Sequence, residues 1–315
     1  MGGARYEYID ILKGFTIIWV LWMHMDLPEL IYPSVQMPIF FFISGSFYHA
    51  KTATLWEQVK GDAYRLLLPT ISFMAIAAVL LILRGEYFWS WNIISVIQNL
   101  RNSSITWFLI ALFCFRALNY PLRQHKGRLG LLVMAVIVYP IGFYWKVRFP
   151  DVVFPVIPMQ EMFMFGIYYV IGFCVGPQII QHSVTRHKGL INPVACFGLV
   201  YIMLVHMLDW KSGILTYVPW LVYSFPYTVA CIYLGLMSCR MLQRIRIVAN
   251  LLSYVGQHSI VFYLTHWPLW IFLFKPLSWN LYVVFLTITV LEFPLIYVIT
   301  HYFPWMIGQK KNFRT

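Results

Sequence analysis

The feature that most constrains this chain is a succession of long apolar stretches, separated by short turns that contain charged residues, proline or glycine. Each stretch approaches the roughly 20 residues that a helix needs to cross the hydrocarbon core of a bilayer. Only 11% of the 315 residues are charged and 61% are hydrophobic, whereas a soluble domain carries about 25% charged residues. Because so little charge cannot cover a surface in water, we expect an all-α, polytopic integral membrane protein whose solvent is the lipid bilayer.

We expect about ten transmembrane helices, forming a single transmembrane domain over 1–315 with no appended soluble domain. The expected spans are 8–25, 34–50, 66–83, 104–120, 129–145, 157–178, 190–208, 213–239, 250–274 and 279–306. An even number of spans places both termini on one side of the membrane. If the N-terminus is cytosolic, 15 of the 23 basic residues fall in cytosolic segments. The positive-inside rule therefore predicts cytosolic N- and C-termini.

The charge distribution and the possible metal ligands argue against two classes of function. The formal net charge is +12, but the basic residues form short clusters between spans. Because they form no basic stripe or helix, we expect no nucleic-acid partner. The nine histidines include no two-histidine helical motif with an acidic partner, and the five cysteines lack metal-ligand spacing. We therefore expect no metal centre.

The first expected span carries three ionisable side chains, Asp10, Lys13 and His24. Such residues are costly inside a membrane and usually mark functional sites. At 100° per residue, the steps from Lys13 to His24 return to within about 20° of the starting direction. The two residues therefore share a face, about 16 Å apart along the axis, and Asp10 precedes Lys13 by one turn. Alternatively, Asp10 and Lys13 form an interfacial ion pair or snorkel, and His24 caps a helix end.

The ninth expected span repeats small and polar residues at helical spacing. Gly256, Ser259, Tyr263 and His266 follow one another, and Pro268 comes shortly after. Ser259 and His266 share a face because seven residues make nearly two turns. Residues of this kind either face a functional cavity or form polar contacts between packed helices, and the spacing leaves both possibilities open.

The order of motifs along the chain carries more information than any one of them. The segments are Arg5, Asp10-Ile11-Leu12-Lys13-Gly14 and His24; Met37-Pro38 and Phe41-Phe42-Ile43-Ser44-Gly45; Arg65-Leu66 and Pro69; Trp107-Phe108-Leu109; and Gly256, Ser259, Tyr263-Leu264 and His266. This series closely resembles the acyltransferase-3 family of membrane acyltransferases over almost the whole chain. Its most specific part is a basic residue followed, after ten others, by His24. Here the basic residue is Lys13 where many relatives have arginine, which favours point-charge binding of phosphate over a bidentate fork.

The resemblance implies an enzyme that moves an acyl group, most often acetyl, from acyl-CoA to a hydroxyl of a sugar. The acceptor would be a glycan or a lipid-linked precursor, and acetyl-CoA would be a substrate rather than a permanently bound cofactor. The chain resembles the stand-alone form of the family, which lacks a soluble domain. The resemblance also implies a multi-pass protein of the bacterial inner (cytoplasmic) membrane.

Roles for individual residues follow as hypotheses from the resemblance. Lys13, together with Arg65, would neutralise the CoA phosphates near the cytosolic face, and Asp10 would orient Lys13. His24 would act as the general base for the acceptor hydroxyl, and a transient acyl-imidazole on His24 is the alternative. The residues expected to bind the acceptor or stabilise the oxyanion are Ser259, Tyr263 and His266. The intramembrane polar residues without an assigned role are Glu161, Arg116, His206 and Glu292.

Two other functions remain as alternatives at this point. A transporter or flippase of a lipid-linked sugar would also need many helices, a polar cavity and a basic cytosolic side. The sequence lacks the inverted repeat and the matched pair of broken helices that usually indicate a transporter. A non-catalytic relative that binds acyl-CoA or a polysaccharide would not need His24. The acceptor, the acyl group, the side of the membrane on which the acceptor is modified and the oligomeric state are not determined by the sequence.

Overall fold

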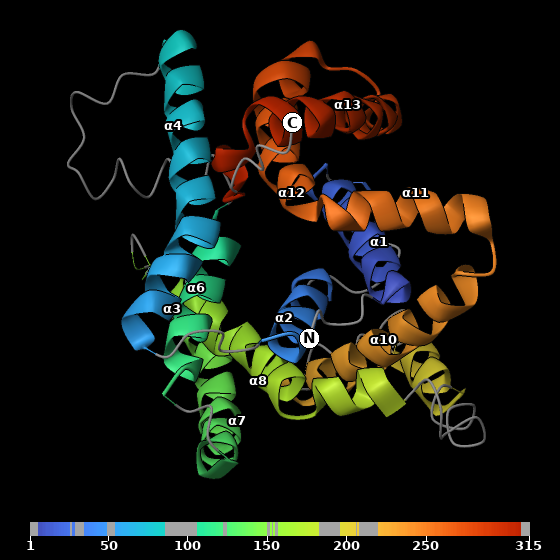
Figure 1. Cartoon of the computed structure of the whole chain (residues 1–315). Coiled ribbons are helices and arrows are strands. Elements are labelled where there is room, and N and C mark those ends of the chain that lie inside the picture. The colour runs from blue at the N-terminus through green and yellow to red at the C-terminus, as the bar shows by residue number, and fades with distance from the viewer. Residues whose placement is uncertain are drawn as a thin grey trace, which may run out of the picture.

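A computed structural model describes residues 6–25, 27–28, 35–48, 54–85, 106–121, 125–149, 152, 154, 157–182, 196–205, 207 and 220–309. Within these ranges the regular structure is helical and contains no strand (Figure 1). The principal helices, in chain order, are α1 (Glu7–His24), α2 (Gln36–Ser46), α3 (Leu55–Asp62), α4 (Leu68–Leu83), α6 (Trp107–Asn119), α7 (His125–Arg148), α8 (Met159–His182), α10 (Trp220–Leu242), α11 (Arg246–Gln257), α12 (Ser259–Pro268) and α13 (Leu281–Tyr302).

Six helical segments of the described part are long and apolar enough to cross a membrane. They are Leu55–Leu83, Gly127–Arg148, Met159–Gln178, Ser224–Leu242, Ser259–Leu277 and Leu281–Tyr302. The chain is therefore an all-helical, multi-pass membrane protein in its described part. The expected number of about ten spans and the cytosolic placement of both termini stay predictions.

The first two expected spans correspond to helices that do not belong to these six. Helix α1 has 18 residues, but it carries Glu7, Asp10 and Lys13 in its first half. Helix α2 has only 11 residues, a rise of about 17 Å, which is roughly half of the hydrocarbon thickness. Both are nevertheless largely buried by the helices around them, so their environment is set more by protein than by lipid.

The third expected span begins earlier than its apolar sequence indicates. Helices α3 and α4 form one continuous segment, Leu55–Leu83, joined by a π-helical turn, η1 (Ala63–Leu67). Thr54 caps its start by accepting a hydrogen bond from the backbone N–H of Glu57, as N-cap threonines do. The polar residues of α3 conceal this extension from a search based on hydrophobicity.

The ninth expected span, 250–274, is broken into two helices. Helix α11 ends at Gln257, His258 adopts a non-helical conformation (φ −105°, ψ 18°), and α12 begins at Ser259. The Nδ1 atom of His258 lies 2.9 Å from the carbonyl oxygen of Tyr254, so the side chain satisfies the end of α11. After Pro268 the chain continues as a second π-helical segment, η3 (Leu269–Phe274). Of the seventh expected span, 190–208, the structure describes an apolar helix at Cys196–Val205.

Glycines allow the central helices to approach one another closely. A Cβ atom on Gly45 of α2 would lie 2.9 Å from the backbone nitrogen of Phe173 in α8. Across the same interface, a Cβ atom on Gly172 would lie 2.9 Å from the carbonyl carbon of Phe42. Gly45 is therefore a close-packing position between helices, as small residues often are in membrane proteins. Figure 1 shows α2 between α8 and α1, near the middle of the molecule.

Candidate active site

The central feature of the candidate site is a direct contact between two histidines from distant parts of the chain. His24 Nδ1, at the end of α1, lies 2.9 Å from His266 Nε2 in α12. The two rings have an interplanar angle of 4°. His24 is partly exposed, whereas His266 has an exposure of 0%. The pair therefore has one ring that is partly exposed and one that is fully buried.

The packing of α1 against α11 and α12 brings the two histidines together. Gly14 of α1 lies directly against Gly256 of α11: a Cβ atom on Gly256 would be 2.8 Å from the Gly14 nitrogen. Both this pair and the His24–His266 pair are separated by 242 residues. The equal separation indicates that α1 runs in the same chain direction as α11 and α12; Figure 1 shows α1 next to both helices. The glycine contact thus sets the alignment that places His266 opposite His24.

A chain of aromatic rings links the histidine pair to two other sequence motifs. The ring of Phe41 in α2 lies 4.9 Å from that of Phe108 in α6, between centroids. Phe108 in turn lies 5.6 Å from Tyr263, and Tyr263 lies 6.2 Å from His266. Tyr263 is buried, while Ser259, at the start of α12, is partly exposed. The motifs of α2, α6 and α12 therefore converge on the same site as His24.

The other end of α1 carries an ion pair. Lys13 Nζ lies 2.7 Å from Asp10 Oδ1, and the side chains are 27% and 9% exposed, respectively. The pairing expected between these two residues is present, and Lys13 is the more accessible partner. Since Asp10 and Gly14 contact Gly256, this ion pair lies next to the C-terminal end of α11.

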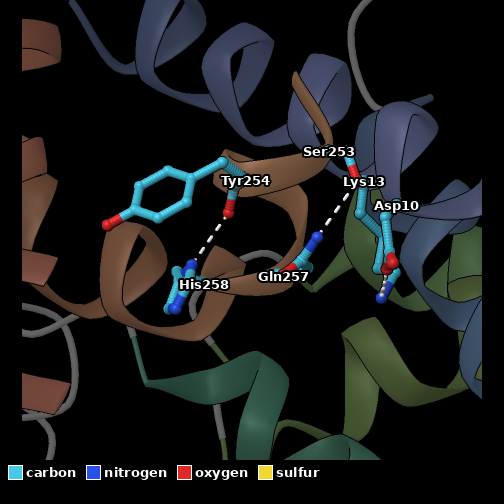
Figure 2. A network of polar contacts seen from close by, with 6 residues as sticks. All are labelled: Asp10, Lys13, Ser253, Tyr254, Gln257 and His258. Atoms are coloured by element: carbon cyan, nitrogen blue, oxygen red, sulfur yellow. Dashed lines mark hydrogen bonds and ion pairs between the residues drawn. The ribbon is translucent and has the colours of Figure 1, made fainter. Parts of the chain in front are cut away.

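Polar side chains of α11 lie close to that ion pair, as Figure 2 shows. Gln257 Nε2 donates to Ser253 Oγ at 3.1 Å, and His258 follows at the break between α11 and α12. Gln257 is exposed and His258 partly so. The glycine contact therefore lies near a charged, polar region that contains Lys13. The histidine pair lies ten residues further along the chain from each glycine, on α1 and, beyond the break, on α12.

Arg65 lies apart from these residues in the described part of the chain. It is exposed and sits in the π-helical turn η1. Gly308, whose φ of +67° suits glycine, packs against its backbone: a Cβ there would be 2.6 Å from the Arg65 Cα. The structure thus brings Asp10 together with Lys13, and Tyr263 with His266 and His24, but shows no contact between Arg65 and Lys13 among the described residues.

Two buried polar contacts involve residues to which the sequence assigned no role. Arg116 Nε forms an ion pair with Asp62 Oδ1 at 2.9 Å, with side chains 18% and 3% exposed. Glu292 in α13 has an exposure of 0%, and its Oε1 and Oε2 atoms lie 2.7 and 2.6 Å from Thr265 Oγ1. The first contact joins α3 to α6 and the second joins α12 to α13. Glu161 is partly exposed, and His206 lies outside the described residues.

Sequence reasoning missed Trp267 and the role of the two glycines. The Trp267 ring meets that of His24 edge to face, with centroids 5.2 Å apart. Its position directly after His266 was the only signal. Gly14 and Gly256 were recognised as motif residues. Their mutual contact depends on how α1 is aligned with α11, and a single sequence does not reveal this alignment. The described residues include no group of three or more His, Cys, Asp or Glu arranged to hold a metal ion.

These features define a multi-pass helical membrane protein with a histidine pair between α1 and α12. A comparison with protein-family models matches residues 6–308 of the 315-residue chain to the acyltransferase domain of the acyltransferase-3 family. The chain therefore belongs to this family, and its general activity is that of a membrane acyltransferase. A search of curated proteins and a search of solved structures each found no match.

Proposed function

We propose that this protein transfers an acyl group, in the first instance acetyl, from acyl-CoA to a hydroxyl of a glycan or lipid-linked sugar, with His24 as the general base. The observation that carries the proposal is the partly exposed His24 ring, held at 2.9 Å by a fully buried histidine. A base must meet the hydroxyl that it deprotonates and must be held in position while it does so. The partial exposure of His24 and its contact with His266 support both requirements.

The proposed reaction needs no other proton carrier. A neutral ring nitrogen of His24 takes the proton from the acceptor hydroxyl while the hydroxyl oxygen bonds to the thioester carbonyl carbon. The tetrahedral intermediate then collapses, the carbon–sulfur bond breaks, and the thiolate of CoA recovers the proton from His24. An imidazole suits both steps because its ordinary pKa of about 6.5 lies close to neutral pH.

Lys13 is the proposed contact for the phosphates of the donor. It lies on the same helix face as His24, about 16 Å away along the axis, a separation that suits an extended pantetheine arm. Its side chain is 27% exposed although Asp10 neutralises its charge in part. We place Asp10 as the residue that orients Lys13, and Arg65 as a second phosphate contact that reaches the donor from η1.

The acceptor would approach the exposed side of His24. Ser259 and Tyr263 are the proposed acceptor or oxyanion contacts. Both residues precede His266 on α12, and the ring centroids of Tyr263 and His266 are 6.2 Å apart. The family resemblance supports a location in the bacterial inner membrane, with acyl-CoA supplied from the cytosol.

Release of free thiol from acetyl-CoA by the purified protein tests this proposal. Wild type in lipid nanodiscs, supplied with a lipid-linked glycan fraction from bacterial membranes, should release CoA, and His24→Ala should not. His301→Ala is the matched control, because His301 is exposed at the end of α13. Folded wild type that neither binds nor consumes acetyl-CoA would contradict the proposal and would favour transport of a lipid-linked sugar.

A further inference from the structure

The histidine pair has the geometry of a hydrogen bond between ring edges rather than a stack of ring faces. The rings are parallel to within 4°, and their centroids lie 5.2 Å apart. The nearest nitrogens, however, are only 2.9 Å apart. Parallel rings whose nitrogens are so much closer than their centroids lie edge to edge in nearly one plane. This arrangement points an N–H of one ring at the in-plane lone pair of the other.

The second nitrogen of His266 decides which ring donates. His266 Nδ1 lies 2.7 Å from the carbonyl oxygen of Phe262, one turn earlier in α12. A carbonyl oxygen only accepts hydrogen bonds, so Nδ1 of His266 carries the proton. In a neutral imidazole the other nitrogen is then an acceptor. His266 Nε2 therefore accepts, and His24 Nδ1 donates.

The same reasoning extends to the nitrogen of His24 on the opposite side of its ring. When Nδ1 of a neutral histidine carries the proton, Nε2 carries the lone pair. The backbone of Phe262 thus fixes the tautomer of His266, and His266 fixes the tautomer of His24. A proton taken up later at His24 Nε2 would leave a positive ring whose Nδ1–H still points at an acceptor.

We infer that His266 is a positioning residue that acts through His24: it holds His24 in the Nδ1–H tautomer, so that Nε2 is the catalytic base. This inference rests on the proposed function in one respect, namely that His24 is the base. It assigns His266 a role different from the acceptor contact expected from the sequence. An exposure of 0% favours this role, because a residue that substrate cannot touch can still orient its neighbour.

Two aromatic rings lie beside the pair and favour a fixed orientation. Trp267 meets the His24 ring edge to face at 5.2 Å, and Tyr263 lies 6.2 Å from the His266 ring. These contacts restrict rotation of the two imidazoles. The hydrogen bond from His24 to His266 then selects one of the two neutral tautomers.

The direct test is the tautomer of His24, measured by ¹⁵N NMR on protein labelled at histidine and held at about pH 8, where an ordinary imidazole is neutral. The His24 signals are identified by their loss in His24→Ala. Wild type should show the proton on Nδ1. His266→Phe, which keeps a ring but removes the acceptor, should shift the proton towards Nε2. His266→Gln, whose carbonyl oxygen can occupy the place of Nε2, should restore the wild-type tautomer.

Turnover provides the second readout. His266→Phe should lower kcat about 10- to 100-fold with the KM for acetyl-CoA unchanged, and His266→Gln should recover most of the loss. A proton on His24 Nε2 in wild type would overturn the inference. So would folded His266→Phe with wild-type kcat. Because the NMR measurement needs no substrate, it decides the tautomer even if acyl transfer itself is not found.

Discussion

Replacement of Gly256 by alanine should lower the activity of the protein by pushing α1 away from α11, ten residues from the histidine pair. The new Cβ atom would lie 2.7 Å from the carbonyl carbon of Asp10 and 2.8 Å from the nitrogen of Gly14, and closer still to the Asp10 carbonyl oxygen. Ordinary carbon contacts are about 3.5–4.0 Å, so α1 and α11 must separate by at least about 1 Å. Both neighbours are backbone atoms, and therefore no side chain can turn away to relieve the contact.

The same displacement should break the hydrogen bond between the histidines. His24 Nδ1 and His266 Nε2 are 2.9 Å apart, and a further separation of about 1 Å takes them beyond hydrogen-bonding distance. A misplacement of about 1 Å in a catalytic group can cost about 100-fold in rate. We therefore expect kcat for thiol release to fall about 100-fold in Gly256→Ala. Overpacking should also lower the free energy of unfolding by about 1–3 kcal/mol.

Matched glycines provide the control for this experiment. A Cβ atom on Gly61 of α3 or Gly130 of α7 meets no atom within 4 Å. Alanine there should leave turnover unchanged and should stabilise the helix slightly, by up to about 1 kcal/mol. The assay is thiol release from acetyl-CoA, with a thermal melt on each variant. Folded Gly256→Ala with the turnover of Gly61→Ala would refute the dependence of the histidine pair on the glycine contact.

Two further substitutions separate donor binding from structural pairing. Lys13→Ala should raise the KM for acetyl-CoA at least about tenfold with little change in kcat. The control is Lys275→Ala, at an exposed lysine, which should leave this KM unchanged. Equal KM values for the two variants would show that Lys13 does not belong to the donor site. Arg116→Ala removes the cation paired with the Asp62 carboxylate, which is 3% exposed and keeps a hydrogen bond from Gln58 Nε2. The loss of the cation should destabilise the fold by about 3–5 kcal/mol. A melting temperature equal to that of wild type would show that this ion pair does not support the fold.

The sequence predicted the features that depend on residue type and on helical periodicity within one segment. The membrane class follows from the sparse charge, and the shared face of Lys13 and His24 follows from helical periodicity alone. The Asp10–Lys13 contact was likewise within reach, because residues three apart on a helix are neighbours. The cost of placing an ionisable group in the membrane made His24 a candidate functional residue, and the family resemblance suggested its role as the base, which stays a prediction.

The remaining features depend on contacts between segments far apart in the chain. Gly14 and Gly256 meet only because α1 and α11 adopt one particular register, and the His24–His266 hydrogen bond depends on the same register. The helix break at His258 is accompanied by a local hydrogen bond to the carbonyl oxygen of Tyr254. No proline or charged residue in the sequence indicates this break. Period and hydropathy describe one helix at a time, and so they could not place Arg65 relative to Lys13.

The most direct test of the account follows the acyl group rather than the thiol. Wild type in nanodiscs is incubated with acetyl-CoA labelled in its acetyl group and with the lipid-linked glycan fraction, and the label in the glycan is measured before and after mild alkali. The account predicts an alkali-labile ester on the glycan with wild type and with His301→Ala, and none with folded His24→Ala. Label transferred by His24→Ala at the wild-type rate would contradict the assignment of His24 as the base.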